Sequence, residues 1–87
     1  MYVILVYDVS EKRVAKMLKL CRRYLNWIQN SVLEGELTQS GLRAMESEIK
    51  ELIDPSTDSV IMFKSRDSRW LEKRIWGIEK GLTDVFL

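Results

Sequence analysis

Residues 2–8 read YVILVYD, and this short stretch decides the architecture that the sequence predicts. Its first six residues are β-branched, aliphatic or aromatic, and they do not alternate with polar residues. Such a run is typical of a central strand that is buried on both faces. Asp8 ends the run, and Ser10 follows as a good helix N-cap with Glu11 in the first turn.

Two amphipathic helices are expected further along the chain. Apolar residues recur with helical spacing from Val14 to Leu25, which predicts a helix at about 11–24 with basic residues on its other face. A second apolar stripe runs between Thr38, a predicted N-cap, and the stop signal at residues 54–55, Asp-Pro.

The remaining segments favour strands. Residues 25–37 are expected to form two short strands, with Gly35 as a candidate bulge, and residues 58–63 form a further apolar strand. The resulting order, βαββαβ, predicts an α+β, ferredoxin-like sandwich with both helices on one face of an antiparallel sheet. Right-handed crossovers place the first and last strands side by side, in the centre of the sheet.

Residues 1–87 form one domain, but residues 66–87 do not fit inside this fold. The tail is rich in large apolar side chains and ends in Asp-Val-Phe-Leu. We expect it to cross to a second copy of the chain and add a strand to the partner's sheet edge, forming a homodimer. Packing against its own sheet is the alternative.

Composition excludes several kinds of chemistry. The 87 residues contain no histidine, which removes imidazole bases, Ser-His or Cys-His nucleophiles and nearly all zinc sites. The apolar run at residues 2–7 is six residues, far short of the roughly 20 that a membrane span needs, and no signal peptide is recognisable. With one cysteine and no leader, we expect a cytoplasmic protein without a membrane partner.

The net charge is only +1, yet the basic residues gather in two stretches. Residues 11–24 and 64–80 each hold six of the 14 lysines and arginines. These stretches are either solvated helix faces or a surface that binds a polyanion. On the second interpretation, the nucleic-acid backbone contacts Arg13, Lys16, Arg66 and Arg69.

Asp8 is the leading candidate for chemistry. A carboxylate at the end of a buried strand is held rigidly, although an aspartate there can also simply cap the helix or form an Asx turn. One carboxylate holds Mg²⁺ poorly, whereas a two-fold dimer could supply two. Tyr7 should point to the opposite sheet face from Asp8, where a core aromatic residue is the alternative to a catalytic one.

Three segments together resemble one family. They are residues 1–9 (MYVILVYDV), residues 29–37 (QNSVLEGEL) and residues 53–60 (IDPSTDSV), and the C-terminal residues 79–87 fit as well. In this order and at this length, the chain resembles the small CRISPR-associated protein two, which partners the CRISPR integrase during spacer capture.

The resemblance implies a ferredoxin-like homodimer with an exchanged C-terminal strand. It also implies metal-dependent endonuclease activity on single-stranded RNA or double-stranded DNA. Asp8 would be the Mg²⁺ ligand shared across the two-fold axis, with Tyr7 beside it in the catalytic motif, and Arg13 is the nearest candidate for a basic residue close to the site. Many members carry an aromatic residue where this chain has Leu33, so weaker nuclease activity is expected.

The sequence is therefore compatible with two alternative functions. One is a spacer-acquisition protein that hydrolyses phosphodiesters with Mg²⁺ held by two copies of Asp8. The other is a non-catalytic, dimeric DNA-binding scaffold that bridges integrase subunits. A ligand-binding regulatory domain is a third, weaker interpretation, because no small-molecule fingerprint is present.

Overall fold

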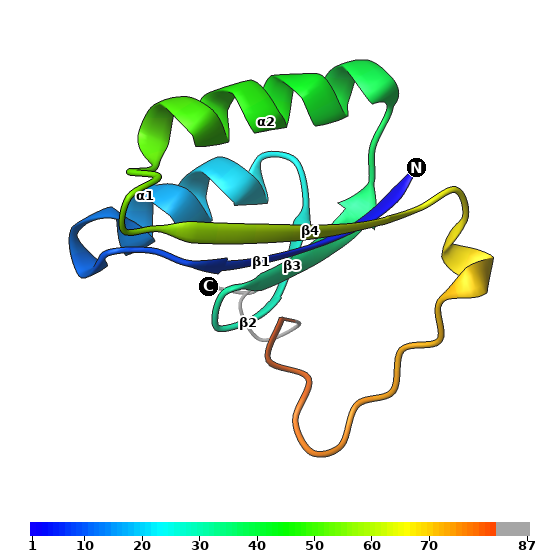
Figure 1. The fold of residues 1–87 in the computed structure, drawn as a ribbon. Helices are drawn as coiled ribbons and strands as arrows, with labels where there is room; N and C mark the ends of the chain where they lie inside the picture. The colour runs from blue at the N-terminus through cyan, green and yellow to red at the C-terminus, as the bar shows by residue number, and fades with distance from the viewer. Residues whose placement is uncertain (82–87) are drawn as a thin grey trace.

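The computed structural model describes residues 1–81 and has the α+β architecture expected from the sequence. Two helices, α1 (Glu11–Arg22) and α2 (Gln39–Leu52), lie side by side on one face of a four-stranded sheet (Figure 1). The strands are β1 (Tyr2–Asp8), β2 (Asn26–Gln29), β3 (Val32–Glu36) and β4 (Ser59–Ser65). We call the sheet face away from the helices the open face.

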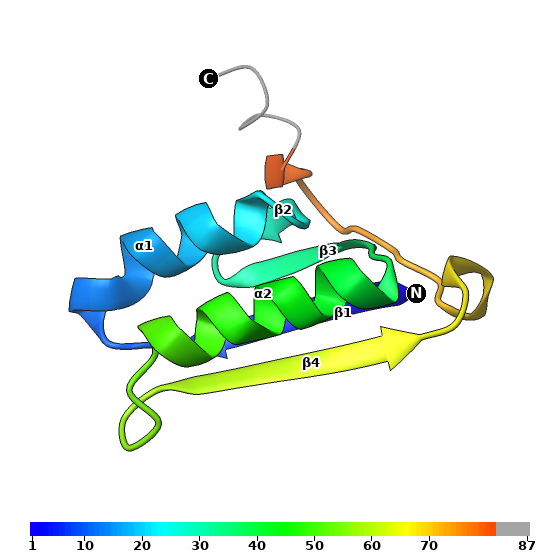
Figure 2. The same ribbon diagram turned by 90° about the horizontal axis from the view of Figure 1, so that it is seen from above.

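All strand pairs are antiparallel, and the sheet order is β2-β3-β1-β4. The first and last strands are therefore neighbours, as predicted, but only β1 lies in the centre. β4 is an edge strand, with β2 at the opposite edge (Figure 2). The central place expected for β4 was wrong because the β2–β3 hairpin occupies the other side of β1.

The core lies between the sheet and the helices. Val3, Leu5 and Tyr7 of β1 point into it, together with Met17 of α1 and Met45 of α2. The residues that alternate with them in β1, namely Tyr2, Ile4 and Val6, lie on the open face and are only partly buried. The apolar run that predicted burial on both faces thus has helices on one face only.

Local signals set the helix ends, with two differences from expectation. Thr38 caps α2 as predicted, because its hydroxyl accepts a hydrogen bond from the Gly41 N–H at 3.1 Å. Ser10 occupies the N-cap position of α1, but its side chain makes no capping bond. The strand irregularity falls between Trp27 and Gln29, whereas Gly35 is paired regularly with Val3.

The tail turns back under its own sheet. After β4, a 3₁₀ turn at Ser68–Trp70 leads into an extended stretch that we call the strap, residues 71–79. The strap passes along the open face towards β2, where Gly81 approaches the backbone carbonyl of Trp27 (Figures 1 and 2). In this single chain, residues 71–81 run along their own sheet. The exchange of residues 66–87 with a second copy, which the sequence predicts, involves a partner chain and stays a prediction; its last residues, 82–87, lie outside the described residues.

Candidate nuclease site at the end of the central strand

Asp8 ends β1 on the open face, and its side chain is exposed. In the antiparallel register it lies directly opposite Ser59, the first residue of β4, which is also exposed. Residues paired in this way point to the same sheet face, with Cβ atoms about 5 Å apart. The Ser59 hydroxyl is therefore a neighbour of the Asp8 carboxylate that sequence reasoning missed, because the pairing depends on tertiary register.

A shallow hollow of about 310 Å³ lies beside Asp8. The turn between β2 and β3 supplies its polar lining, Asn30 and Ser31. Asn30 adopts a left-handed backbone conformation, with φ at 44°, as tight turns require. The polar groups around Asp8 are consequently hydroxyls and an amide, and together with the carboxylate they form an all-oxygen set of potential ligands.

Tyr7 faces the other way. Its ring is 4% exposed and belongs to the core cluster, so its body packs under the helices while Asp8 faces the open side. Burial, followed by the influence of Cys21, raises the pKa of the Tyr7 phenol above its ordinary value. A buried, protonated phenol is a poor proton acceptor, and the environment of Tyr7 does not support the predicted catalytic role.

Arg13 is also placed differently from the prediction. Its guanidinium donates from Nε to Asp58 Oδ2 at 2.6 Å and from Nη2 to Asp58 Oδ1 at 3.1 Å. The side chain of Arg13 is only 15% exposed and that of Asp58 is 0% exposed. A guanidinium held in this bidentate way is not available to a phosphate backbone, so the predicted backbone contact does not fit its surroundings.

The other predicted backbone ligands are exposed but dispersed. Lys16 lies on α1 and lines a hollow with Lys19 and Arg23. Arg66 and Arg69 follow β4, at the end of the sheet opposite Asp8, because Ser65 pairs with Tyr2. Six residues of strand separate the two ends by about 20 Å. Within one chain, the structure does not bring Arg66 and Arg69 to Asp8.

The environment of Cys21 excludes it as a nucleophile, and acidic clusters are also absent from the described residues. Cys21 is fully buried, and burial raises the pKa of its thiol to about 11, so the reactive thiolate is scarce. Within residues 1–81, no group of three or more Asp, Glu or Cys side chains is close enough to hold a metal ion. Within the described residues, the Asp8 carboxylate therefore belongs to no cluster of three or more such side chains, and its pairing partner Ser59 is a hydroxyl residue.

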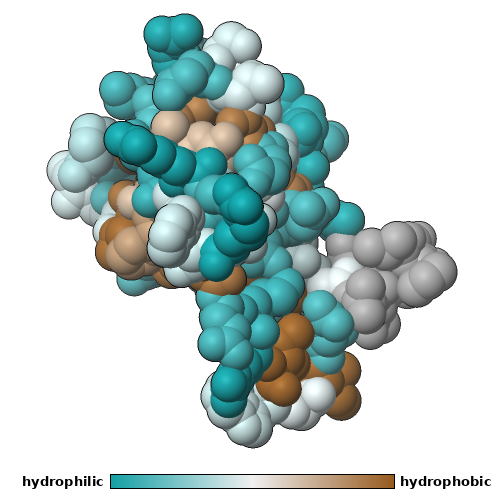
Figure 3. All heavy atoms as spheres, turned by 90° about the vertical axis from the view of Figure 1, so that its right-hand side faces the viewer, coloured by the Kyte–Doolittle hydropathy of each residue, from teal (hydrophilic) through white to brown (hydrophobic). Residues whose placement is uncertain are grey.

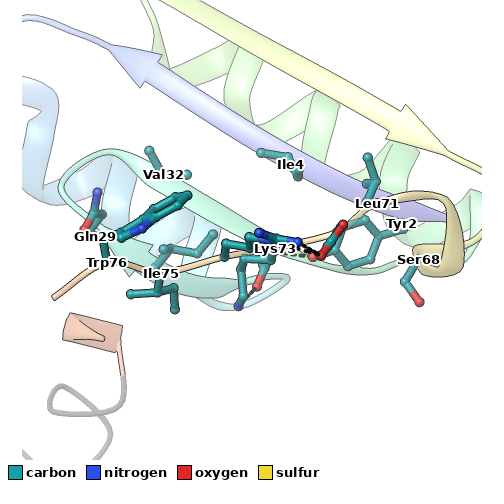
Figure 4. Close-up of a pocket in the computed structure, with 13 residues that line it drawn as sticks. Tyr2, Ile4, Gln29, Val32, Ser68, Leu71, Lys73, Ile75 and Trp76 are labelled. Carbon is teal, nitrogen blue, oxygen red and sulfur yellow. Dashed lines mark hydrogen bonds and ion pairs between the residues drawn. The ribbon is translucent and has the colours of Figure 1, made fainter. Parts of the chain in front are cut away.

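A second polar cluster lies at the far end of the open face. Glu34 of β3 accepts a hydrogen bond from the Tyr2 hydroxyl and forms an ion pair with Lys73 of the strap (Figure 4). Burial, and then the bond to Glu34, raises the pKa of Tyr2 to about 12. A cavity of about 560 Å³ lies between strap and sheet, lined by Ile4, Val32 and Trp76 among others (Figure 4).

Comparison with known proteins identifies the family. The model of CRISPR associated protein Cas2 matches residues 1–73. The chain belongs to the Cas2 family. A Cas2 from Dictyoglomus turgidum, named a CRISPR-associated endoribonuclease, is 46% identical over 87 residues and covers 100% of both chains. A relative of the same name from Thermotoga maritima is 49% identical over 81 residues, covering 93% of each chain.

Solved structures agree. A Cas2 crystal structure superposes with a TM-score of 0.78 at 38% sequence identity, covering 92% of this chain and 90% of the other. The ferredoxin-like fold and the family suggested by the resemblance are therefore confirmed, and the predicted enzyme class is the one in the names of these Cas2 relatives. No helix within residues 1–81 is long and apolar enough to cross a membrane.

Proposed function

We propose that this Cas2 protein is a cytoplasmic endoribonuclease whose active unit is a homodimer with Asp8 of each copy at the reaction centre. The observation that carries the proposal is the exposed Asp8 carboxylate at the end of the central strand, on a sheet face that the helices leave open and the strap covers only in part. The endoribonuclease names of relatives at 46% and 49% identity agree with it.

The uncovered face supports dimer formation. Ile61 and Phe63 of β4 lie on it with 51% and 59% of their surface exposed, although they sit beside the apolar Val6 and Ile4 of β1. The tail carries exposed large side chains as well, since Trp70 and Ile78 are 80% and 77% exposed. Figure 3 shows hydrophobic and hydrophilic side chains together on this part of the surface. A second copy that covered this face would bury these side chains and bring the two Asp8 carboxylates towards one two-fold axis.

The ligand set around Asp8 fits a hard divalent cation. Carboxylate, hydroxyl and amide oxygens are the donors that Mg²⁺ takes, usually with one or two carboxylates and several waters. One chain offers one carboxylate there, and two chains would offer two. A cation so held supplies Lewis-acid polarisation of a phosphate oxygen.

The chain's own groups would then position the substrate. Lys16 and the other exposed cations of α1 would hold the phosphate backbone, while Asp8 would hold the cation that faces the scissile phosphate at the dimer axis. The Ser59 hydroxyl, beside Asp8 in the register, donates to a phosphate oxygen or to water. Spacer acquisition together with a CRISPR integrase subunit is the cellular process that we infer for this dimer.

Cleavage assays test the proposal directly. Labelled single-stranded RNA and duplex DNA are incubated with the purified protein and Mg²⁺, in parallel with Asp8→Asn, which keeps the size of the side chain. We expect wild-type protein to cut RNA and Asp8→Asn to lose at least about 100-fold in rate, as other charge-stabilising groups do when removed. Equal cutting by both proteins would place the activity elsewhere or in a contaminant.

A specific observation favours a second candidate, the non-catalytic scaffold. No histidine exists in the sequence, and Tyr7 and Cys21 are buried, so no obvious general base accompanies Asp8 in the described part of the chain. On this candidate, the dimer binds DNA through its basic residues and bridges integrase subunits. Binding of duplex DNA by both wild type and Asp8→Asn, with no cleavage by either, would favour the scaffold.

A further inference from the structure

Asp58 is the centre of a hydrogen-bond network that joins two turns distant in sequence. Its carboxylate accepts hydrogen bonds from Arg13 on α1, from the Ser10 N–H at 2.8 Å and from the Asp54 N–H at 2.9 Å. Thr57 also belongs to this network, because its hydroxyl accepts a hydrogen bond from Arg13 Nη2 at 3.3 Å. The Asp58 side chain is 0% exposed, and each of its oxygens has at least two donors.

This hydrogen-bond network involves residues next to Asp8 in two segments of the chain. Ser10 lies two residues after Asp8, at the start of α1, and Asp58 immediately precedes Ser59, which pairs with Asp8 across the β1–β4 ladder. One carboxylate therefore ties the chain that leaves Asp8 to the strand that faces it. Asp58 also supplies a negative charge at the N-terminus of α1, where the Ser10 hydroxyl makes no capping bond.

We propose that Arg13 and Asp58 are positioning residues, whose buried ion pair fixes the turn after Asp8 and thereby holds the Asp8 carboxylate in its working orientation. This inference rests on the proposed function of Asp8. On this proposal, Arg13 does not contact the nucleic-acid backbone but acts through the position of Asp8. Misplacement of a reacting group by about 1 Å costs on the order of 100-fold in rate, so such a role has a large effect.

The two roles of Arg13 give opposite results in three variants. If Arg13 positions Asp8, then Arg13→Lys and Arg13→Gln both lose the bidentate geometry and both lower kcat by at least about 10-fold, with KM for RNA unchanged. Asp58→Asn should lower kcat similarly, and the double variant Arg13→Gln/Asp58→Asn should be little worse than either single variant. The salt dependence of RNA binding should stay the same in all of them.

A phosphate contact by Arg13 predicts otherwise. Arg13→Lys would then keep most of the activity. Arg13→Gln would raise KM and lower the slope of log K against log salt by about 0.7. Asp58→Asn would strengthen RNA binding, because it would free the Arg13 guanidinium. That pattern would overturn the proposal. Glu48→Gln is the matched control, because it removes the ion pair of Glu48 in α2 with Arg23, which directly follows α1, at 2.5 Å, and should leave kcat unchanged.

Two readouts do not need cleavage. Mn²⁺ affinity, followed by relaxation of water protons, should fall at least about 10-fold in Arg13→Lys, as it does when groups that orient a ligand are removed. Amide hydrogen exchange at Val9 and Ser10 should accelerate in the same variant while the core strands stay protected. If wild type does not cleave, the proposed function fails alone; unchanged Mn²⁺ affinity and unchanged exchange at Val9 and Ser10 would reject the positioning role.

Discussion

Lys73 of the strap forms an ion pair with Glu34 of β3, on the sheet face that the helices leave open (Figure 4). The pair joins residues 39 positions apart in sequence. Lys73 is 47% exposed and Glu34 is 12% exposed, so water screens the charges only in part. This contact anchors the strap, near its beginning, to its own sheet in the single chain.

Removing this anchor should free the strap without unfolding the domain. We expect Lys73→Ala to lower the free energy of unfolding by less than about 1 kcal/mol, as partly exposed ion pairs do. Chymotryptic cleavage after the exposed Trp76 should nevertheless accelerate several-fold. Arg74→Ala is the control, since Arg74 pairs with Glu72 inside the strap; equal cleavage of both variants would show that Lys73 does not anchor it.

The dimer proposal predicts that a charge on the open face separates the protomers. Phe63→Lys should raise the dimer dissociation constant at least about 30-fold, the effect of a lost interface hot spot of about 2 kcal/mol. Because Phe63 is 59% exposed in the single chain, the fold of the monomer should survive. Sedimentation measures the change. Ala44→Lys, at an exposed position of α2 on the other side of the sheet, should remain dimeric; dissociation of both variants, or of neither, would place the interface elsewhere.

Acid should weaken the fold through Asp58. The hydrogen bonds from Arg13 hold the pKa of Asp58 far below its usual range, so the carboxylate contributes stability above the unfolded pKa of about 3.9 and loses it as pH falls towards the folded pKa. We expect the free energy of unfolding to decrease steeply with acid below about pH 4. Arg13→Gln should flatten that slope, as measured by urea unfolding.

The matched variant for this acid series is Arg69→Gln. Arg69 pairs with Asp67 in an exposed position, where it also lowers a carboxyl pKa, but its side chain is 84% exposed. Screening by water should therefore leave the acid slope of Arg69→Gln close to that of wild type. If Arg13→Gln leaves the decrease of the free energy of unfolding with falling pH unchanged, other carboxyl groups dominate acid unfolding.

Alkali should weaken the fold through Cys21. Its pKa is raised to about 11 by burial, so the protonated thiol contributes stability at neutral pH that is lost as pH rises from the unfolded value of about 8.5 through 11. Cys21→Ala leaves a small cavity but cannot ionise. The stability advantage of wild type over Cys21→Ala should therefore shrink above about pH 8.5, by roughly 2 kcal/mol at pH 10. A constant difference up to pH 10 would contradict this.

Local patterns predicted most of the secondary structure. The YVILVYD run became β1, the helical spacing of apolar residues became α1 and α2, and Thr38 caps α2. These signals succeed because strand burial, helix periodicity and capping depend on residues close in sequence. The placement of Asp8 at the end of a central strand followed from the same patterns.

Residue identity alone misled at the polar positions. Arg13 looked like a backbone ligand, whereas it binds Asp58, 45 residues away. Ser10 looked like the cap of α1, whereas a distant carboxylate occupies that end of the helix. Neither pairing produces a periodic pattern in the sequence, because the partner of a charged side chain depends on which segments the folded chain places next to it.

The strand and helix order followed from composition and short-range spacing, whereas the family and the role of Asp8 followed from the resemblance of three sequence segments to known relatives. Tertiary structure alone decided that β4 lies at an edge, that Ser59 faces Asp8 and that Arg13 is withdrawn from solvent. The reason is physical. Sheet order, cross-strand register and buried ion pairs are set by contacts between segments that meet only when the core between the sheet and its helices has closed.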